Sequence, residues 1–244
     1  MSRSALILAT ALLALASPAI AKKPSAIEAT IADTSRNADN RGMDEGREPA
    51  AILAFSGFAK GQVVADYSAG GGYYSELIAG LVKPNGMVLA LESPRFYKSD
   101  VWDKVKAAHP GIVTVVSDNL DLAPRSVDAV FTHLVFHDLF LPARPGQVAT
   151  DPARVLANWF AAVRPGGHVI IVDHVGAPGD VTKTAGSLHR IDPAAARAAM
   201  EKAGFVFESE SSVLQRSGDD HTLRVFDPAI RGKTDRFVMK FRRP

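Results

Sequence analysis

Short apolar runs alternate with segments of helical period along most of the chain, after a polar stretch that ends near residue 48. Elements that alternate in this way form a mostly parallel sheet with helices on both faces. In the last run, Phe237, Met239 and Phe241 alternate with other residues as in an edge strand. We therefore predict an α/β fold with a single Rossmann-like, doubly wound, mostly parallel seven-stranded sheet and an antiparallel C-terminal edge strand. The predicted strands cover residues 62–67, 86–92, 111–118, 127–138 (its last part a loop), 168–174, 205–215 and 235–241.

Proline and glycine mark the ends of the predicted helices. Pro49, Pro152 and Pro193 each stand where a first helical turn begins, and an aspartate that can cap the helix precedes the last two. Glycines or a Pro-Gly-Gly run follow several of these segments and stop them. The predicted helices cover residues 49–57, 73–82, 100–108, 151–164 and 192–204.

The first residues read differently from the rest. Arg3 precedes an apolar run at 5–16, which is shorter than the ~20 residues that span a bilayer, and the small-x-small site Ala19-Ile20-Ala21 follows. This order predicts a signal peptide at 1–21, an N-terminal extension at 22–48 and one domain at 49–244, in an exported protein, with a bacterial periplasm as the expected location. A buried N-terminal helix is the alternative interpretation.

Charge and cysteine content exclude some functions. The net charge is +2 and the basic residues are scattered, so we expect no nucleic-acid partner. The chain has no cysteine, which rules out disulfides, thiolate metal ligands and lipid attachment at cysteine. We expect no stable membrane anchor once the signal is cleaved, and the sequence leaves the oligomeric state open.

Polar residues stand where each of the five predicted parallel strands ends. Ligands bind at the carboxyl ends of such strands, so these residues are expected to share one site. The strand-end residues are Asp66, Glu92, Asp118 with Asn119, His137 with Asp138, and Asp173 with His174.

The stretch "ADYSAGGGYYSELI" at residues 65–78 places glycines between a strand and a helix. At Gly70 and Gly72 the backbone can take positive φ and approach a ligand, while the helix start offers free N–H groups. Glu92 stands 20 residues beyond Gly72, within reach of a ribose in such folds. The nicotinamide pattern G-x-G-x-x-G fails because Ser75 occupies its last position. A glycine-rich turn with no ligand is the competing interpretation.

The run Asp66-Tyr67-Ser68-Ala69-Gly70-Gly71-Gly72 resembles the D-x-G-x-G-x-G motif of class I S-adenosylmethionine-dependent methyltransferases. The "SD" after the third strand, "THLVFHDL" and "RPGGHVIIVDH" are similar to that family's later motifs, in order. More narrowly, "LHRID" and "GKTDRFVMKF" resemble a subgroup of predicted exported bacterial methyltransferases. The resemblance implies a methyltransferase-like domain at 49–244 with S-adenosylmethionine as its cofactor.

The resemblance also implies roles for single positions. The glycine loop would hold the methionine part of the cofactor with Asp66 near its amino group, Glu92 would hold the ribose, and Asp118 with Asn119 the adenine edge. Ser68 departs from the family pattern, which has a glycine there, and this departure bears on cofactor affinity. Tyr73 could shape the cofactor pocket or pack as core.

Four of the seven histidines lie near predicted strand ends or in the loops after them. A neutral imidazole can take a proton from an acceptor, and we predict His137 with Asp138, and His174 with Asp173, as the base and the group that orients it. His133 and His189 could be purely structural. The same residue types could bind a metal, but their spacing matches no tight signature, so we predict no metal site.

The predicted function is methyl transfer from S-adenosylmethionine to an unidentified small acceptor by direct in-line attack. One alternative is a non-catalytic methyltransferase-like ligand-binding domain in the periplasm, favoured by Ser68 and by the export signal, since this cofactor is made in the cytoplasm. A metal-dependent hydrolase or lyase is a third.

Overall fold

A seven-stranded sheet forms the centre of the computed structural model, which describes residues 24–143 and 149–244. The predicted signal peptide lies outside the described residues. The strand order is β3-β2-β1-β4-β5-β7-β6, and β1 to β5 pair in parallel. The strands are β1 Val63–Tyr67, β2 Met87–Glu92, β3 Ile112–Val116, β4 Val127–His133, β5 Val163–His174, β6 Val206–Ser211 and β7 Arg236–Arg242. The predicted Rossmann-like, mostly parallel sheet of seven strands is confirmed.

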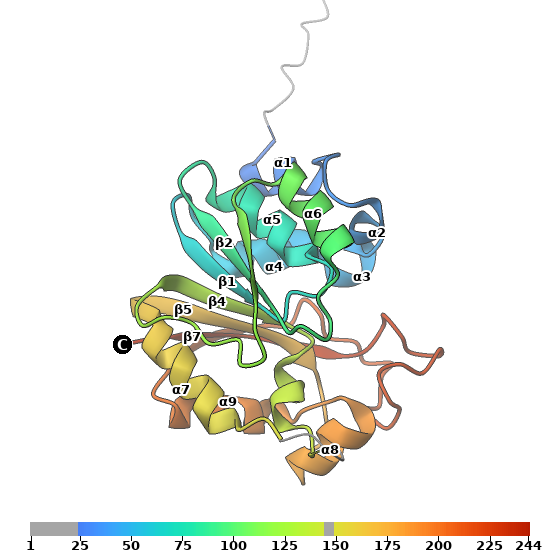
Figure 1. The fold of residues 1–244 in the computed structure, drawn as a ribbon. Helices are drawn as coiled ribbons and strands as arrows, with labels where there is room; N and C mark the ends of the chain where they lie inside the picture. Colours follow the sequence, from blue (N-terminus) through green and yellow to red (C-terminus); the bar gives the residue numbers. More distant parts are fainter. Residues whose placement is uncertain (1–23, 144–148) are drawn as a thin grey trace, which may run out of the picture.

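Helices cover both faces of the sheet (Figure 1). One face packs against α4 Pro49–Ser56, α5 Tyr73–Val82 and α6 Ser99–Ala108, and its core includes Ile52, Leu77 and Trp102. The other packs against α7 Pro152–Ala162 and α9 Pro193–Lys202, with Trp159 and Met200 in its core. Each face therefore has its own buried layer, as in doubly wound folds.

The capping signals of the sequence are realised in the structure. Asp151 accepts a hydrogen bond from the N–H of Ala153 at the start of α7, and Asp192 caps α9 in the same way. Gly57 takes φ 70° and ends α4. The helix α8 Val181–Leu188 was not predicted, and it ends at His189 in a left-handed conformation.

The antiparallel strand is β7, and it lies one place inside the edge of the sheet. It pairs with β5 on one side and with β6 on the other, so β6 is the edge strand. Phe237, Val238 and Met239 are all buried, which shows that both faces of β7 are covered. The strand β5 also begins at Val163, five residues before the predicted start at 168.

The N-terminal extension folds as three short helices, α1 Ala26–Ile31, α2 Ala38–Arg41 and α3 Asp44–Arg47. Arg36 pairs with Asp44 at 2.8 Å, and Asn40 donates to Glu76 of α5 at 2.8 Å. These contacts fix the extension against the helix that follows the glycine loop, so it belongs structurally to the domain.

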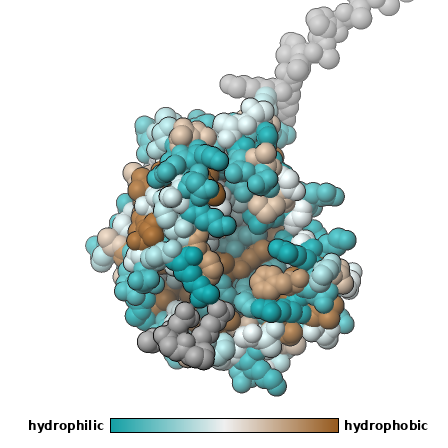
Figure 2. Space-filling view, turned by 45° about the vertical axis from the view of Figure 1, so that its right-hand side comes forward, coloured by the Kyte–Doolittle hydropathy of each residue, from teal (hydrophilic) through white to brown (hydrophobic). Residues whose placement is uncertain are grey.

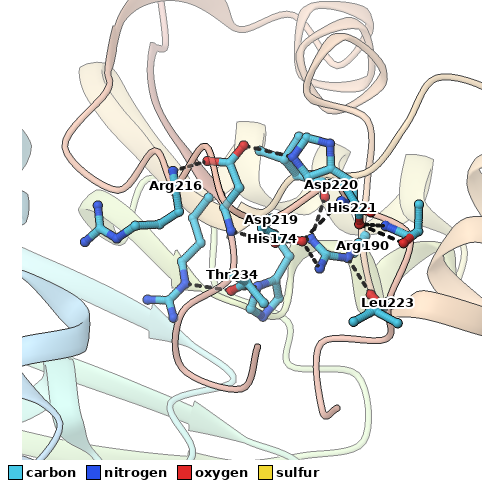
Figure 3. A network of polar contacts seen from close by, with 12 residues as sticks. His174, Arg190, Arg216, Asp219, Asp220, His221, Leu223 and Thr234 are labelled. Carbon is cyan, nitrogen blue, oxygen red and sulfur yellow. Dashed lines mark hydrogen bonds and ion pairs between the residues drawn. The ribbon is translucent and has the colours of Figure 1, made fainter. Parts of the chain in front are cut away.

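Residues 212–235 connect β6 to β7 and lie against the ends of β5 and α8. The guanidinium of Arg190 pairs with Asp219 at 2.9 Å and donates to the carbonyl of Leu223 (Figure 3). Residues 136–140 form the 3-10 helix η1 Phe136–Phe140 directly after β4. Within the described part of the chain, no helix is both long enough and apolar enough to cross a membrane.

Candidate functional site

Two cavities open at the carboxyl ends of the parallel strands. The smaller has a volume of about 260 Å³ and the larger about 890 Å³. Ser68, Leu134 and Val135 line both, so the two spaces meet between the end of β1 and the end of β4. Turning this edge forward shows the surface hollowed near its middle (Figure 2). Both cavities therefore lie where the strand order reverses.

The glycine loop turns from β1 into α5 through positive φ angles. Gly70 has φ 59° and Gly72, which begins the helix, has φ 79°. A Cβ at Gly72 would also lie 3.3 Å from Trp102, so this position favours glycine for two reasons. Ser68 has φ 54°, the left-handed region that costs an L side chain roughly 1–2 kcal/mol. The position where the family pattern has glycine is therefore strained in this chain.

Asp66 lies at the bottom of the smaller cavity. Its side chain is buried, and Oδ2 accepts a hydrogen bond of 2.6 Å from the hydroxyl of Ser75. Burial, partly opposed by Ser75 and reinforced by the carboxylate of Glu92, raises the pKa of Asp66 to about 7. Asp66 lines the smaller cavity, where its carboxyl group can meet a ligand.

Glu92 supports the loop from behind. The N–H of Gly70 donates to Oε2 at 2.7 Å, and the N–H of Ser93 donates to Oε1 at 2.9 Å. Glu92 is buried and lines neither cavity. Burial raises its pKa, against the effect of these two donors. Both carboxylate oxygens thus already accept backbone N–H groups, and the predicted contact with a ribose stays a prediction.

Arg47, at the end of α3, also lines the smaller cavity. Its guanidinium carbon lies 4.2 Å from the centre of the Tyr73 ring, and the Tyr73 hydroxyl donates to Asp44 at 2.7 Å. Burial lowers the pKa of Arg47, although arginine stays charged at neutral pH. The sequence analysis missed Arg47, because nothing in the polar extension marks it as part of a site.

The larger cavity begins where the loops after β2 and β3 meet. Asp118 and Asn119 line it together with Ser68, Ser93 and Phe96. Phe96 is 63% exposed and stands at the surface, where an aromatic ring can lie over a bound planar group. Of the predicted cofactor residues, Asp66, Gly70 and Tyr73 line the smaller cavity, whereas Gly72 begins α5 and Glu92 accepts the N–H of Gly70.

The predicted catalytic residues come together at the far wall of the larger cavity. Asp173 Oδ1 lies 2.8 Å from His137 Nδ1, and its Oδ2 accepts the N–H of His137 at 2.7 Å. His137 Nε2 lies 3.2 Å from Asp138 Oδ1 and 3.3 Å from His189 Nδ1. Burial lowers the pKa of His137, but the carboxylates of Asp173 and Asp138 outweigh it and raise this pKa to about 10.

The pairing predicted for His174 differs from the observed one. The ring of His174 pairs with Thr234 at 2.7 Å (Figure 3), whereas Asp173 orients His137. Burial lowers the pKa of His174 to about 3, although the Asp173 carboxylate opposes this. His133 lines the smaller cavity beside the ring of Tyr74, and burial lowers its pKa well below the ordinary value. His189, for which the sequence leaves a purely structural role open, lines the larger cavity.

Comparisons with known proteins found one family model and several solved structures that resemble this chain. A family model described as a methyltransferase domain matches residues 65–171. A SAM-dependent methyltransferase from Aquifex aeolicus is 18% identical with a TM-score of 0.60, over 85% of this chain and 100% of its own. One from Mesorhizobium loti is also 18% identical, with a TM-score of 0.59 over 83% of this chain and 100% of its own. A search of curated protein sequences found no match.

A third solved structure contains ligands. The 1,6-didemethyltoxoflavin-N1-methyltransferase of Burkholderia thailandensis, bound to 1,6-didemethyltoxoflavin and S-adenosylhomocysteine, is 16% identical, with a TM-score of 0.56 over 84% of this chain and 79% of its own. These likenesses confirm the predicted fold, and residues 65–171 match the model of a methyltransferase domain. The narrower resemblance to exported methyltransferases stays a prediction.

Proposed function

We propose that this protein transfers the methyl group of S-adenosylmethionine to a small-molecule acceptor. The observation that carries the proposal is the pair of joined cavities at the strand ends. The smaller one would hold the methionine part of the cofactor, and the larger one its adenosine part and the acceptor. A methyl group at their junction, near Ser68, Leu134 and Val135, would face the acceptor space.

Charge in the smaller cavity matches the amino-acid part of this cofactor. Both Asp66 and Arg47 line this cavity, and Asp66 would bind the ammonium group while Arg47 would bind the carboxylate. Because the carboxyl group of Asp66 has a pKa of about 7 in the free protein, the nearby ammonium group would favour its ionised form. Arg47, from the N-terminal extension, thus adds a positive charge to the methionine site in which Asp66 was predicted.

Adenosine recognition is assigned to the loops after β2 and β3. Asp118 and Asn119 line the cavity at the place where the adenine edge is expected, and Phe96 can cover its ring. Glu92 would hold the glycine loop in shape through the two backbone N–H groups that it accepts. A contact with the ribose would be made by the same carboxylate in addition to these two hydrogen bonds. The N-terminus of α5 then faces the bound cofactor with free N–H groups.

The acceptor would bind between η1, α8 and the 212–235 connection. Leu141, His189, Val225 and Phe226 line this part of the larger cavity. The volume of about 890 Å³ suits a small molecule beside the adenosine group, since ligand pockets usually measure roughly 300–1,000 Å³. The structurally similar Burkholderia methyltransferase, solved with bound 1,6-didemethyltoxoflavin, supports a small-molecule acceptor.

The catalytic contribution would consist of alignment and of a charged wall. Direct attack needs the nucleophile in line with the sulfonium methyl and water kept out. With its raised pKa, His137 carries a proton at neutral pH, so it would pair with an anionic acceptor oxygen rather than take its proton. His174 stays neutral and, with Asp138, would complete the polar wall that receives the acceptor.

Titration of the full chain with S-adenosylmethionine and S-adenosylhomocysteine in a calorimeter tests the proposal. We expect saturable binding in the micromolar range, and no binding at millimolar concentration would overturn it. Release of S-adenosylhomocysteine on addition of phenols or heterocyclic amines would then test transfer. Cofactor binding without transfer to any acceptor would favour the non-catalytic ligand-binding alternative, which Ser68 and the export signal motivate.

Location is proposed separately, because it rests on the sequence alone. We propose that residues 1–21 direct export to the periplasm and are cleaved after Ala21. Fractionation of cells and N-terminal sequencing of the recovered protein test this. A protein found in the cytoplasm with its first 21 residues intact would contradict it.

A further inference from the structure

Three donor atoms converge at one point on the wall of the larger cavity. His137 Nε2 lies 3.2 Å from Asp138 Oδ1 and 3.3 Å from His189 Nδ1, and the last two atoms are 3.7 Å apart. Donors about 2.1 Å from one metal ion lie roughly 3.0–3.4 Å apart in octahedral or tetrahedral arrangements. We propose that His137, Asp138 and His189 bind a divalent transition-metal ion.

The surroundings of His137 are those of a metal-binding histidine. Asp173 is fully buried, and its carboxylate accepts the backbone N–H groups of His137 and His174, both at 2.7 Å. Its remaining interaction, 2.8 Å to His137 Nδ1, holds a proton on that nitrogen, so Nε2 is the nitrogen that would bind the ion once it has released its own proton. A carboxylate that orients a metal-binding imidazole in this way also increases its basicity.

The donor set selects the kind of ion. Two imidazoles with one carboxylate suit first-row transition metals such as Zn²⁺ and Fe²⁺, whereas Mg²⁺ and Ca²⁺ prefer oxygen ligands throughout. The carboxylates of Asp138 and Asp173 offset the two positive charges of the ion. The ion would take the place of the proton that His137 otherwise carries between these carboxylates.

Three protein ligands leave coordination positions open toward the cavity. All three residues line the larger cavity, in the part proposed for the methyl acceptor. An ion there would hold a water molecule or an acceptor oxygen, and it would favour the ionised form of that oxygen. The proposed methyl transfer does not depend on this ion, and the metal site can be tested without the cofactor.

One contact has to change when the ion binds. Arg224 Nη2 lies 3.1 Å from His189 Nε2, which makes this nitrogen an acceptor in the metal-free protein. Coordination through Nδ1 places a proton on Nε2, and Arg224 must then turn away. Since Arg224 is exposed, this movement is inexpensive, and it predicts that Arg224→Gln strengthens metal binding several-fold.

The test is a titration of the full chain, purified without an affinity tag and stripped with a chelator, with Zn²⁺ by calorimetry and with Co²⁺ by visible absorption. We expect one equivalent to bind with micromolar or tighter affinity. His189→Asn and Asp138→Asn should each weaken binding by about 100-fold or more, and Asp173→Asn by roughly 10- to 100-fold. Asparagine suits position 189 because it also tolerates the left-handed conformation with φ 54°.

His168→Gln is the matched control. His168 pairs with Glu208 of β6 at 3.1 Å, in the middle of β5 and away from its carboxyl end, and its loss should leave the affinity unchanged. Melting curves verify that each variant is folded. If His189→Asn does not fold, Asp138→Asn alone can test the site, because the Asp138 side chain is 43% exposed and its replacement should not disturb the fold. No saturable binding by the native chain, or equal affinity in Asp138→Asn and His168→Gln, would overturn the proposal. Cofactor titration of the metal-free protein is independent of either result.

Discussion

Replacing Asp66 by asparagine should affect stability and cofactor binding in opposite directions. Asp66 is only 3% exposed, and its pKa rises from 3.8 to about 7 in the folded protein. When the pKa of a group is higher in the folded than in the unfolded protein, the group stabilises the fold fully at pH values below the unfolded pKa. This stabilisation is lost as the pH rises to the pKa of the folded protein. The stability of the free protein should therefore fall between pH 3.8 and about pH 7, and above this range the buried carboxylate is ionised and destabilising.

The size of this effect follows from the shift. A shift of roughly 3 units at 1.36 kcal/mol each corresponds to roughly 4 kcal/mol, of which the step from pH 5 to pH 8 covers roughly 2–3 kcal/mol. Asparagine can still accept the hydrogen bond from Ser75 and does not ionise. Asp66→Asn should therefore gain roughly 2–3 kcal/mol more stability at pH 8 than at pH 5, or roughly 5–10 °C in melting temperature.

Cofactor binding should respond in the other direction. The loss of a charge-assisted hydrogen bond to the ammonium group costs roughly 1.5–3 kcal/mol, so affinity for S-adenosylmethionine at pH 8 should fall about 10- to 100-fold. Native affinity should itself decline below pH 7, because a proton must leave Asp66 before the ammonium group binds.

The assay is thermal unfolding of the native chain and Asp66→Asn at pH 5 and pH 8, with calorimetric titration of S-adenosylmethionine at pH 8. Asp103→Asn is the control, because its side chain is 69% exposed and its replacement should have the same small effect at both pH values. An equal gain in melting temperature at pH 5 and pH 8 would refute the reasoning about burial. Unchanged cofactor affinity would refute the assignment of Asp66.

Three further substitutions test neighbouring parts of the site. Arg47→Ala should weaken S-adenosylmethionine binding about 10- to 100-fold while changing adenosine binding little, since it removes only the partner of the carboxylate; calorimetry with both ligands measures this. Ser68→Gly should raise stability by roughly 1 kcal/mol in denaturant unfolding, because glycine adopts φ 54° without strain. The affinity of Ser68→Gly for S-adenosylmethionine distinguishes two cases. A large gain in affinity would indicate a decayed cofactor site, whereas no gain would indicate that Ser68 belongs to a functional version of the motif. Glu92→Gln should lower stability by roughly 1–3 kcal/mol, because its amide N–H₂ must face the N–H of Gly70 or Ser93; no loss would contradict the bracing role.

Much of the fold could be predicted because its signals are local. Asp151 and Asp192 each precede a proline at a helix start, and both act as caps in the structure. The glycine loop was placed correctly between strand and helix, since only a tight turn with positive φ at Gly70 and Gly72 requires these residues. The position of β7 in the sheet depends instead on pairing with strands that are distant in the sequence. The alternating apolar residues of β7 do not indicate which strands these are.

Arg47 and His189 show why part of the site could not be predicted. Arg47 lies in a polar extension without periodicity, and it reaches the cavity only because Arg36 and Asn40 fix that extension against its neighbours. His189 follows a helix that the sequence analysis did not predict, so nothing related it to His137, 52 residues earlier.

The incorrect pairing of His174 with Asp173 has a simpler physical reason. Successive side chains of a strand point to opposite faces of the sheet, so these neighbours at the end of β5 could not orient each other. Asp173 instead reaches His137 after β4, and His174 reaches Thr234 before β7. The charge state of the site is thus set by pairs between adjacent strands. A substitution of Asp173 should consequently act on His137, and on any cation held there, before it acts on its neighbour in sequence.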